Sequence, residues 1–383
     1  MDIIVFYVCA AVLAYTYVGY PLLMATWARL RPRPVRRAAI RARVAIIVVA
    51  HNEEARIGAK LRTCLDQDYP ADLARVVVAT DGSSDRTNAI VEAAGEPHVR
   101  LLPFATRRGK AACLNDAAAA CDEDILVFTD ARQALDPQAV RCLVETLGDP
   151  EVGAVSGELH FLRDDMTPFG ESVDAYWKYE KFIRQCEAAV HSAPGVTGAL
   201  YAIRKSCFVP IPERTILDDV AIPMQSVRAG YRTVFDSRAL VYDKPSQSAA
   251  QEKLRKVRTL AGNYQLVAMM PWLLNPGINP IAVQYVSHKL LRLAAPFAML
   301  GLLLTNAALA LGSAGYAAAL AFHLLGYGLA LAALLSPAVA CWRPARLAST
   351  FLVMNWYAVL GLVQFLSNRG GHLWQSSAGV ARG

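Results

Sequence analysis

Charged residues are scarce in this chain of 383 residues: they make up 19% of it, whereas hydrophobic residues make up 55%. A folded surface in water needs more polar cover than this, so the composition argues against a wholly water-soluble globule. The mean hydropathy of +0.28 also excludes an intrinsically disordered chain. The sequence therefore predicts membrane-spanning segments.

Paired cysteines are lacking as well. The eight cysteines form no Cys-x-x-Cys pair and no Cys/His cluster with the spacing of a zinc site. We interpret them as small buried hydrophobic residues in a reducing compartment.

Four long stretches contain no Asp, Glu, Lys or Arg: residues 3–28, 293–312, 316–341 and 347–366. Each is long enough, at ~1.5 Å per residue, to cross a hydrocarbon core of ~30 Å as a helix. We therefore predict one transmembrane helix near the N-terminus and three near the C-terminus. The lack of charge inside them argues against an ion-coupled transporter.

The net charge of +7 is concentrated in one short segment, because residues 29–43 hold seven arginines and no carboxylate. We interpret this segment as a basic juxtamembrane arm that attracts anionic membrane lipids, and not as a nucleic-acid site. The positive-inside rule then places the N-terminus outside and the arm in the cytoplasm, at the inner membrane. Alternating crossings put Arg343 and Arg346 in the cytoplasm and the C-terminus outside, although Arg369 and Arg382 argue mildly for the other side.

Residues 44–285 have the composition and length of one large globular domain, which this topology places in the cytoplasm. Short apolar runs at 44–50, 75–80, 99–102 and 124–130 alternate there with amphipathic segments. Such alternation predicts an α/β fold in which helices cover both faces of a parallel sheet. In these sheets, ligands bind at the carboxyl ends of the strands.

Polar residues follow several of these runs. Glu53 lies in the His-Asn-Glu-Glu segment after the first run, and Asp81 begins an Asp-Gly-Ser-Ser-Asp turn after the second. Helix capping explains part of this pattern, since Asn, Ser and Asp cap helices and acidic residues suit a helix start. Capping leaves Asp81 unexplained, and a carboxylate at a strand end suits hydrogen bonds to a base or ribose.

A third carboxylate, Asp130, follows the run at 124–130, and Arg132 stands two residues beyond it. Carboxylate oxygen at this position suits a Mg²⁺ or Mn²⁺ ion that bridges a diphosphate. Lys110 opens a helical stretch and is placed to bring a cation near phosphate, although a solvated charge run is an equal interpretation of that segment alone.

The order of these motifs resembles that of the family 2 glycosyltransferases with a membrane-embedded GT-A catalytic domain, which include hyaluronan, cellulose and chitin-oligosaccharide synthases. The resemblance covers residues 44–285 and implies a Rossmann-like GT-A fold with a mixed, mostly parallel sheet. It also implies that Glu53 and Asp81 bind the nucleotide and that Asp130 holds the metal. Arg132 stands where a DxD motif has its second carboxylate, so it is expected to contact phosphate.

The remaining family motifs fall in the second half of this domain. Asp218-Asp219 resembles the end of a TED motif, which makes Asp219 the expected general base. Arg255 and Arg258 lie in the stretch that corresponds to QxxRW, whose cations hold diphosphate; Thr259 replaces the Trp, an aromatic platform for a sugar.

Gly198 and Tyr201 lie in a segment that resembles the one lining the acceptor site. From the residues alone, that segment is equally a strand after a turn. Asp218 and Asp219 have a second explanation as first-turn residues of a helix, which is the less favoured one.

Together these features predict an inverting hexosyltransferase of family 2 that uses a nucleotide sugar, with UDP-sugars expected from the resemblance. A polysaccharide or glycan acceptor is favoured by the synthase-like layout, whereas Thr259 and the small number of spans favour a single transfer to a lipid-linked acceptor. A non-catalytic nucleotide-binding subunit of an export complex is the remaining alternative, because the DxD motif is altered.

Overall fold

The computed structural model describes residues 2–162, 168–244 and 249–367. Its first half contains α1 Asp2–Ala14, η1 Tyr15–Gly19, α2 Tyr20–Leu30, β1 Val44–Ala50, α3 Ile57–Leu65, β2 Ala74–Asp81, α4 Thr87–Ala93, β3 Val99–Phe104, α5 Lys110–Ala119, β4 Ile125–Asp130, β5 Ala134–Leu135, α6 Ala139–Leu147, β6 Val152–Phe161 and α7 Pro168–Val190. The second half contains β7 Leu200–Arg204, η3 Lys205–Cys207, α8 Asp218–Arg228, β8 Arg232–Asp243, α9 Ala249–Met269, η4 Pro271–Leu274, α10 Ala282–Tyr285, η5 Val286–Leu290, α11 Leu291–Ala310, α12 Ala314–Leu335, α13 Pro337–Ala340 and α14 Arg343–Leu366.

The eight strands found among the described residues form one sheet in the order β3-β2-β1-β4-β7-β6-β8-β5. Strands β1 to β4 are parallel, β7 runs antiparallel to both of its neighbours, and β6 and β8 pair in parallel. The predicted α/β fold with a mixed, mostly parallel sheet is therefore confirmed. The four predicted strands correspond to β1 to β4.

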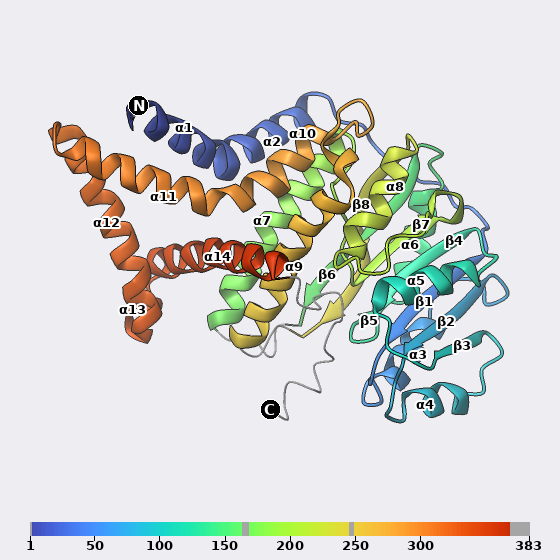
Figure 1. Ribbon diagram of the computed structural model, residues 1–383. Helices are drawn as coiled ribbons and strands as arrows, with labels where there is room; N and C mark the ends of the chain where they lie inside the picture. The colour runs from blue at the N-terminus through green and yellow to red at the C-terminus, as the bar shows by residue number, and fades with distance from the viewer. Residues whose placement is uncertain (1, 163–167, 245–248, 368–383) are drawn as a thin grey trace.

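Helices cover both faces of the sheet, as Figure 1 shows. Strand β1 is buried along its whole length, and its side chains alternate between two cores. Val44, Ile46 and Val48 pack with α3 and α6, whereas Ala45 and Ile47 pack with α5 and α8. A strand buried on both faces is apolar throughout, which explains why β1 has no polar residue before its carboxyl end.

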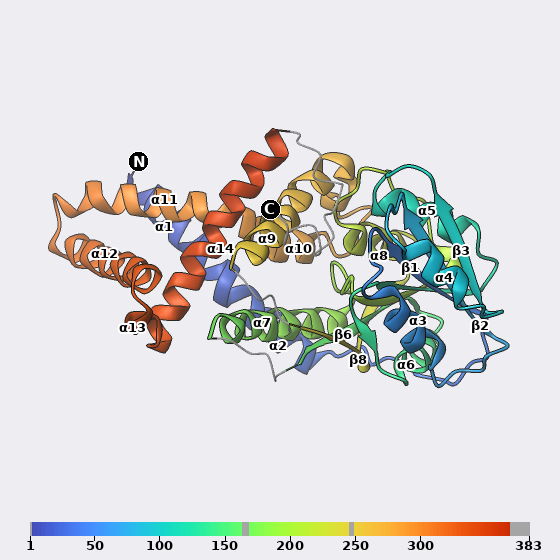
Figure 2. The ribbon, with the colours of Figure 1, turned by 90° about the horizontal axis from the view of Figure 1, so that it is seen from below.

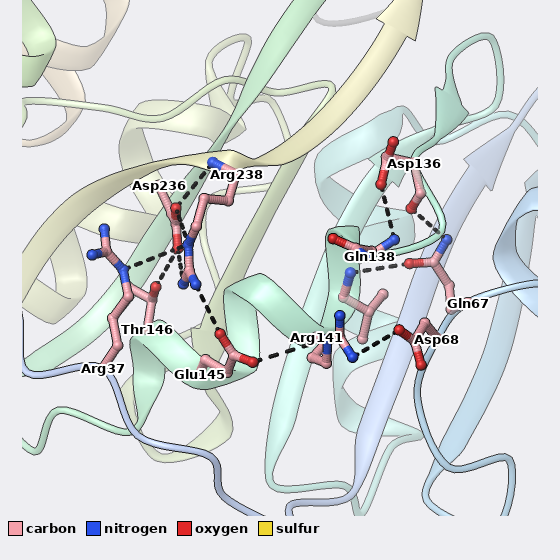
Figure 3. A network of polar contacts seen from close by, with 11 residues as sticks. Arg37, Gln67, Asp68, Asp136, Gln138, Arg141, Glu145, Thr146, Asp236 and Arg238 are labelled. Carbon is pink, nitrogen blue, oxygen red and sulfur yellow. Dashed lines mark hydrogen bonds and ion pairs between the residues drawn. The ribbon is translucent and has the colours of Figure 1, made fainter.

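The basic arm is attached to the sheet domain. Its backbone donates hydrogen bonds from Arg33 N to the Ala189 carbonyl (2.7 Å) and from Ala38 N to the Glu145 carbonyl (3.0 Å). Arg37 lies 3.4 Å from the buried carboxylate of Asp236, in the polar network of α6 and β8 in Figure 3. The arm therefore fixes the first span relative to the sheet, in addition to any contact with lipid.

Within the part of the chain that the structure describes, four helical segments are long and apolar enough to cross a membrane: Asp2–Leu30, Ala282–Ala310, Ala314–Leu335 and Arg343–Leu366. The predicted arrangement of one N-terminal and three C-terminal apolar helices is thus confirmed. Helices α7 and α9 lie between the outer parts of these helices and the sheet in both views (Figures 1 and 2).

Contacts of α14 show which way it runs. Its middle lies beside the first span, where the Tyr17 hydroxyl donates a hydrogen bond to Asn355 Oδ1 (3.1 Å). Its last turns lie beside α9: a Cβ added at Gly361 would be 2.9 Å from Leu260 Cβ. Since α9 adjoins the sheet domain, α14 ends on the same side as that domain.

Helices α12 and α13 lie at the end of the molecule farthest from the sheet (Figures 1 and 2). The hydroxyl of Tyr316, at the start of α12, lies 3.4 Å from that of Tyr7 in the first span. The structure therefore differs from the predicted alternation. Arg343 and Arg346 lie at the end of α14 far from the sheet domain, and the last described residues lie near that domain.

Candidate active site

The loops after β1 and β2 hold each other in place. Asn52 adopts a left-handed conformation (φ 53°), and its Oδ1 accepts a hydrogen bond from Ser84 N at 2.9 Å. Glu53 is 8% exposed, its carboxylate lies 2.9 Å from Arg56, and its backbone N–H donates to Thr87 Oγ1. Residue Ala50 is in register with Thr80, so Glu53 and the turn after β2 share the carboxyl edge of the sheet.

Asp81 is fully buried at the end of β2 and shapes the loop before α5. Its Oδ1 accepts hydrogen bonds from the backbone N–H groups of Arg108 (2.6 Å) and Gly109 (3.1 Å). Gly82 has φ +62°, and a Cβ there would lie 2.7 Å from Arg107 N, so this close approach requires glycine. Asp81 thereby fixes the residue that follows, Lys110.

Lys110 bridges two carboxylates of different elements. Its Nζ lies 2.9 Å from Asp130 Oδ1 at the end of β4 and 3.1 Å from Asp218 Oδ2 at the start of α8. Burial alone would lower the pKa of the Lys110 ammonium, but Asp130 and Asp218 raise it well above its usual range. Burial would likewise raise the pKa of Asp130, and the charge of Lys110 outweighs this and lowers it. Both groups are therefore charged at neutral pH.

Asp219 follows Asp218 in the sequence. Its pKa is raised, whereas that of Asp130 is lowered. Burial and the neighbouring Asp218 carboxylate raise its pKa to about 6, while Lys110, Arg184 and Lys289 act to lower it. A carboxylate with this pKa accepts a proton readily near neutral pH. We call Asp130, Asp218 and Asp219 the carboxylate cluster.

Gly198 lies against this cluster. A Cβ added at Gly198 would be 3.3 Å from Asp219 Oδ2, and the Asp219 carbonyl accepts a hydrogen bond from Val196 N at 2.9 Å. The segment before β7 therefore packs on the carboxylate of Asp219, and a side chain at residue 198 would require this carboxylate to shift. Tyr201 is fully buried, and its ring stacks on Phe128 with 4.9 Å between the centroids. Because Tyr201 is buried, its position favours a role in packing beside the carboxylate cluster and not the predicted contact with an acceptor.

Arg255 and Arg258, the two cations of α9 predicted to bind diphosphate, also lie near the carboxylate cluster. Burial lowers the pKa of the Arg258 guanidinium, and the carboxylate cluster opposes this shift from close by. Arg255 lies near Arg132 and Asp130. Arg132 itself pairs with Asp243 at 2.6 Å, so this contact engages the side chain expected to bind phosphate.

Two supporting residues were not predicted from the sequence. Lys60 is buried, and its Nζ donates hydrogen bonds to Thr129 Oγ1 (2.6 Å) and to the Gln133 carbonyl (2.8 Å). Thr129 Oγ1 in turn donates to the Ala199 carbonyl at 2.7 Å. Lys60 thus links the strand end that carries Asp130 to the residue after Gly198. The sequence could have indicated this role, because Lys60 lies on the same face of α3 as the apolar residues Ile57 and Leu61.

Asp243 is the second residue that the sequence did not reveal. It lies at the end of β8, and its Oδ2 accepts hydrogen bonds from Arg132 and from Gln133 Nε2 (3.0 Å). A single acidic residue at the end of a strand, outside any recognisable motif, gives no signal of a contact with a residue 111 positions away.

Few side chains of the described site can serve as metal ligands. Within the described ranges, no group of three or more His, Cys, Asp or Glu side chains is placed to hold a metal ion. Asp130 uses Oδ1 for Lys110, and its side chain is 40% exposed. One carboxylate suits Mg²⁺ or Mn²⁺ when substrate phosphates and waters supply the other ligands.

Residues 45–208 match the family described as Glycosyl transferase family 2. This stretch is similar to a family 2 glycosyltransferase domain. It contains β1 to β4 and β7 and, with them, Glu53, Asp81, Lys110 and Asp130. This match agrees with the predicted enzyme class, a glycosyltransferase.

Known proteins agree with this assignment. The chain is 24% identical over 246 residues to "Probable glycosyltransferase YdaM" of Bacillus subtilis (strain 168), covering 59% of this chain and 56% of that protein. It is 27% identical over 215 residues to an N-acetylglucosaminyltransferase of Rhizobium meliloti (strain 1021), covering 52% and 50%. The chain thus spans about half the length of these curated relatives.

A solved structure resembles nearly the whole chain. The mannosyltransferase PcManGT from Pyrobaculum calidifontis, in complex with GDP-Man and Mn²⁺, is 26% identical and superposes with a TM-score of 0.72. The match covers 95% of this chain and 99% of that one, so it includes the apolar helices as well as the glycosyltransferase domain.

Proposed function

We propose that the protein is an inverting glycosyltransferase that moves a sugar from a nucleotide donor to a glycan or lipid-linked acceptor at the inner face of the membrane. One observation carries the proposal: the Lys110 ammonium bridges Asp130 and Asp218, directly beside Asp219. A cation for a leaving diphosphate and a carboxylate with a pKa of about 6 therefore lie side by side.

The chemistry follows from these two groups. An acceptor hydroxyl attacks the anomeric carbon while the bond from that carbon to the diphosphate oxygen breaks. Asp219 takes the hydroxyl proton, and a positioned base of this kind contributes about 10² to 10⁴ in rate. Lys110 and Arg258 stabilise the charge that develops on the leaving diphosphate. A single displacement needs no covalent enzyme intermediate, so the anomeric configuration inverts.

The nucleotide is proposed to lie along the carboxyl ends of β1, β2 and β4, between Glu53 and Lys110. Asp81 holds the loop that positions Lys110, and Arg255 adds positive charge from α9. UDP-sugars are proposed as donors from the resemblance. GDP-sugars belong in the same test, because the mannosyltransferase of similar structure was solved with GDP-Man.

A divalent cation fits this site when it arrives with the donor. Asp130 would be its protein ligand, and a bound Mg²⁺ or Mn²⁺ would neutralise part of the diphosphate charge. Arg132 stands in the position of the second DxD carboxylate, and its guanidinium is paired with Asp243.

The test is a panel of UDP- and GDP-sugars incubated with the purified full chain in detergent, with released nucleotide as the readout. We expect one donor to be turned over, and turnover to stop when a chelator is added. Asp219→Asn should retain the wild-type unfolding temperature and lose about 10² to 10⁴ of the transfer rate. Wild-type turnover in this variant would refute the assignment of the base, and a complete lack of turnover with every donor would favour the non-catalytic subunit.

A further inference from the structure

Residues 208–217 connect η3 to α8 and lead directly into Asp218; we call them the lead-in segment. Pro210 and Pro212 restrict its backbone, because each proline ring fixes φ at about −65°. A turn follows, in which Thr215 donates hydrogen bonds from its N–H (2.9 Å) and its hydroxyl (2.6 Å) to the Pro212 carbonyl. The position of this stiff segment therefore sets the position of the carboxylates that come after it.

Asn115 of α5 holds the lead-in segment before the turn. Its Oδ1 accepts a hydrogen bond from Ile211 N (3.0 Å), and its Nδ2 donates one to the Ile211 carbonyl (2.7 Å). One side-chain amide thus satisfies both polar backbone groups of a buried residue that lies outside the sheet. Because Lys110 begins the same helix, these two bonds fix the lead-in segment relative to Lys110.

Gln265 of α9 holds the lead-in segment after the turn. Its Oε1 accepts a hydrogen bond from Ile216 N (2.9 Å), and its Nε2 donates one to the Arg214 carbonyl (2.9 Å). Arg258 lies seven residues before Gln265 in α9, which is about two helical turns, so both side chains project from the same face of the helix. The lead-in segment is therefore fixed relative to Arg258 as well.

The two amides connect the elements that act together in the proposed reaction. Lys110 on α5 and Arg258 on α9 are proposed to stabilise the diphosphate, and an error of ~1 Å in the placement of a catalytic group can cost about 10²-fold in rate. We propose that Asn115 and Gln265 are positioning residues for sugar transfer: they hold the lead-in segment between α5 and α9 and thereby place Asp219 against the diphosphate site. The inference rests on the proposed function, which it deepens by naming residues that act through Asp219.

Gln67 provides a matched control for Gln265, because it also bonds to backbone groups of a neighbouring loop. Its Nε2 donates to the carbonyls of Thr63 (2.8 Å) and Asp136 (2.9 Å), and its Oε1 accepts from Val140 N at 3.0 Å (Figure 3). These contacts lie on the face of the sheet that α3 and α6 cover, opposite to α5 and α8. Loss of the Gln67 amide should therefore destabilise the protein without moving the lead-in segment.

The test compares these variants by nucleotide release, with the full chain in detergent and a saturating concentration of the donor that it turns over. Gln265→Met and Gln67→Met should both lower the unfolding temperature, because each loses hydrogen bonds to a loop. Only Gln265→Met should lower kcat, by about 10 to 100-fold. Gln265→Glu keeps the acceptor for Ile216 N and should lower kcat by a smaller factor. Equal kcat values in Gln265→Met and Gln67→Met overturn the proposal; if Gln265→Met does not fold, a wild-type kcat in Gln265→Glu overturns it.

A double variant shows whether the two amides act through the same segment. Asn115→Leu combined with Gln265→Met should lower kcat by less than the product of the two single effects, because either loss alone already displaces the lead-in segment. A loss equal to that product overturns the shared role. If the wild type releases no nucleotide from any donor, the proposed function fails, whereas release that both single variants leave unchanged refutes only this inference.

Discussion

At the scale of single residues, the site depends on the contrast between two neighbouring carboxylates. Asp218 shares the Lys110 ammonium with Asp130, whereas Asp219 lacks a cation at bonding distance among the contacts described above. Burial and the charge of Asp218 raise the pKa of Asp219 to about 6. The two residues are adjacent in sequence, and their different surroundings give them different roles.

This contrast predicts the pH dependence of transfer. Asp219 acts as a base only when deprotonated, so kcat/KM should rise with pH through about 6 and level off above it. Asp218→Asn removes the negative charge that helps to raise this pKa, so the acidic limb should move to lower pH. The profile is measured as kcat/KM for the donor between pH 5 and 9, at about 0.5-unit steps. A limb that stays in place in Asp218→Asn would show that another group titrates.

A second prediction concerns the space beside the base. A methyl group at Gly198 would lie 3.3 Å from Asp219 Oδ2, so Gly198→Ala should displace this carboxylate. Misplacement of a catalytic group by a fraction of an ångström to 1 Å costs about 10 to 100-fold in kcat. Gly58→Ala is the control, because its methyl group would make an ordinary contact, 3.7 Å from Ile90. Equal kcat values in the two variants would contradict the close packing of Gly198.

At the scale of elements, the strand-and-helix pattern that repeats along the chain was sufficient to predict the first four strands of the sheet. Apolar runs bounded by polar residues identified β1 to β4, and the residues at their ends share one edge because parallel strands place them there. The ion pair of Arg132 was not predicted. Its motif indicated that it binds phosphate, whereas in the structure it pairs with Asp243. Contacts between β4 and β8 depend on how the second half of the sheet folds, and no local pattern encodes this.

Helix α9 connects the membrane side to the catalytic loop, and its contact with that loop can be tested. A Cβ at Gly262 would lie 2.6 Å from Leu217 Cγ, one residue before Asp218. Gly262→Ala should therefore push α9 away from the start of α8, destabilise the protein by about 1 to 3 kcal/mol and reduce transfer. Gly328→Ala in α12 is the control, since nothing lies within 4 Å of its added Cβ. Thermal unfolding and donor turnover are compared, and an unchanged Gly262→Ala would contradict this contact.

At the scale of the whole molecule, the order of the spans was predictable, but their direction was not. Charge counting placed Arg343 and Arg346 on the side of the sheet domain. The structure places them at the far end, because α14 runs back toward α9 while α12 lies across the outer end of the bundle (Figure 1). The contacts between helices thus favour a direction for α14 opposite to the one predicted from Arg343 and Arg346.

Cysteine accessibility tests this topology. Cys341 is exposed, just before α14, and should react with a membrane-impermeant maleimide in intact cells if the sheet domain is cytoplasmic. Ser367→Cys, introduced together with Cys341→Ser, lies at the other end of α14 and should react only after the membrane is opened. The reverse pattern would support the alternation predicted from charge and contradict the arrangement described here.

The central claim is that Lys110, the carboxylate cluster and Arg258 surround one nucleotide diphosphate. The most direct measurement is a cryo-electron microscopy structure of the full chain with the nucleoside diphosphate released from its active donor. The account predicts that the diphosphate lies within ~3 Å of Lys110 Nζ and the Arg258 guanidinium, on the same side of the sheet as Asp219. A diphosphate bound out of reach of Lys110, or at a separate place on the molecule, would contradict it.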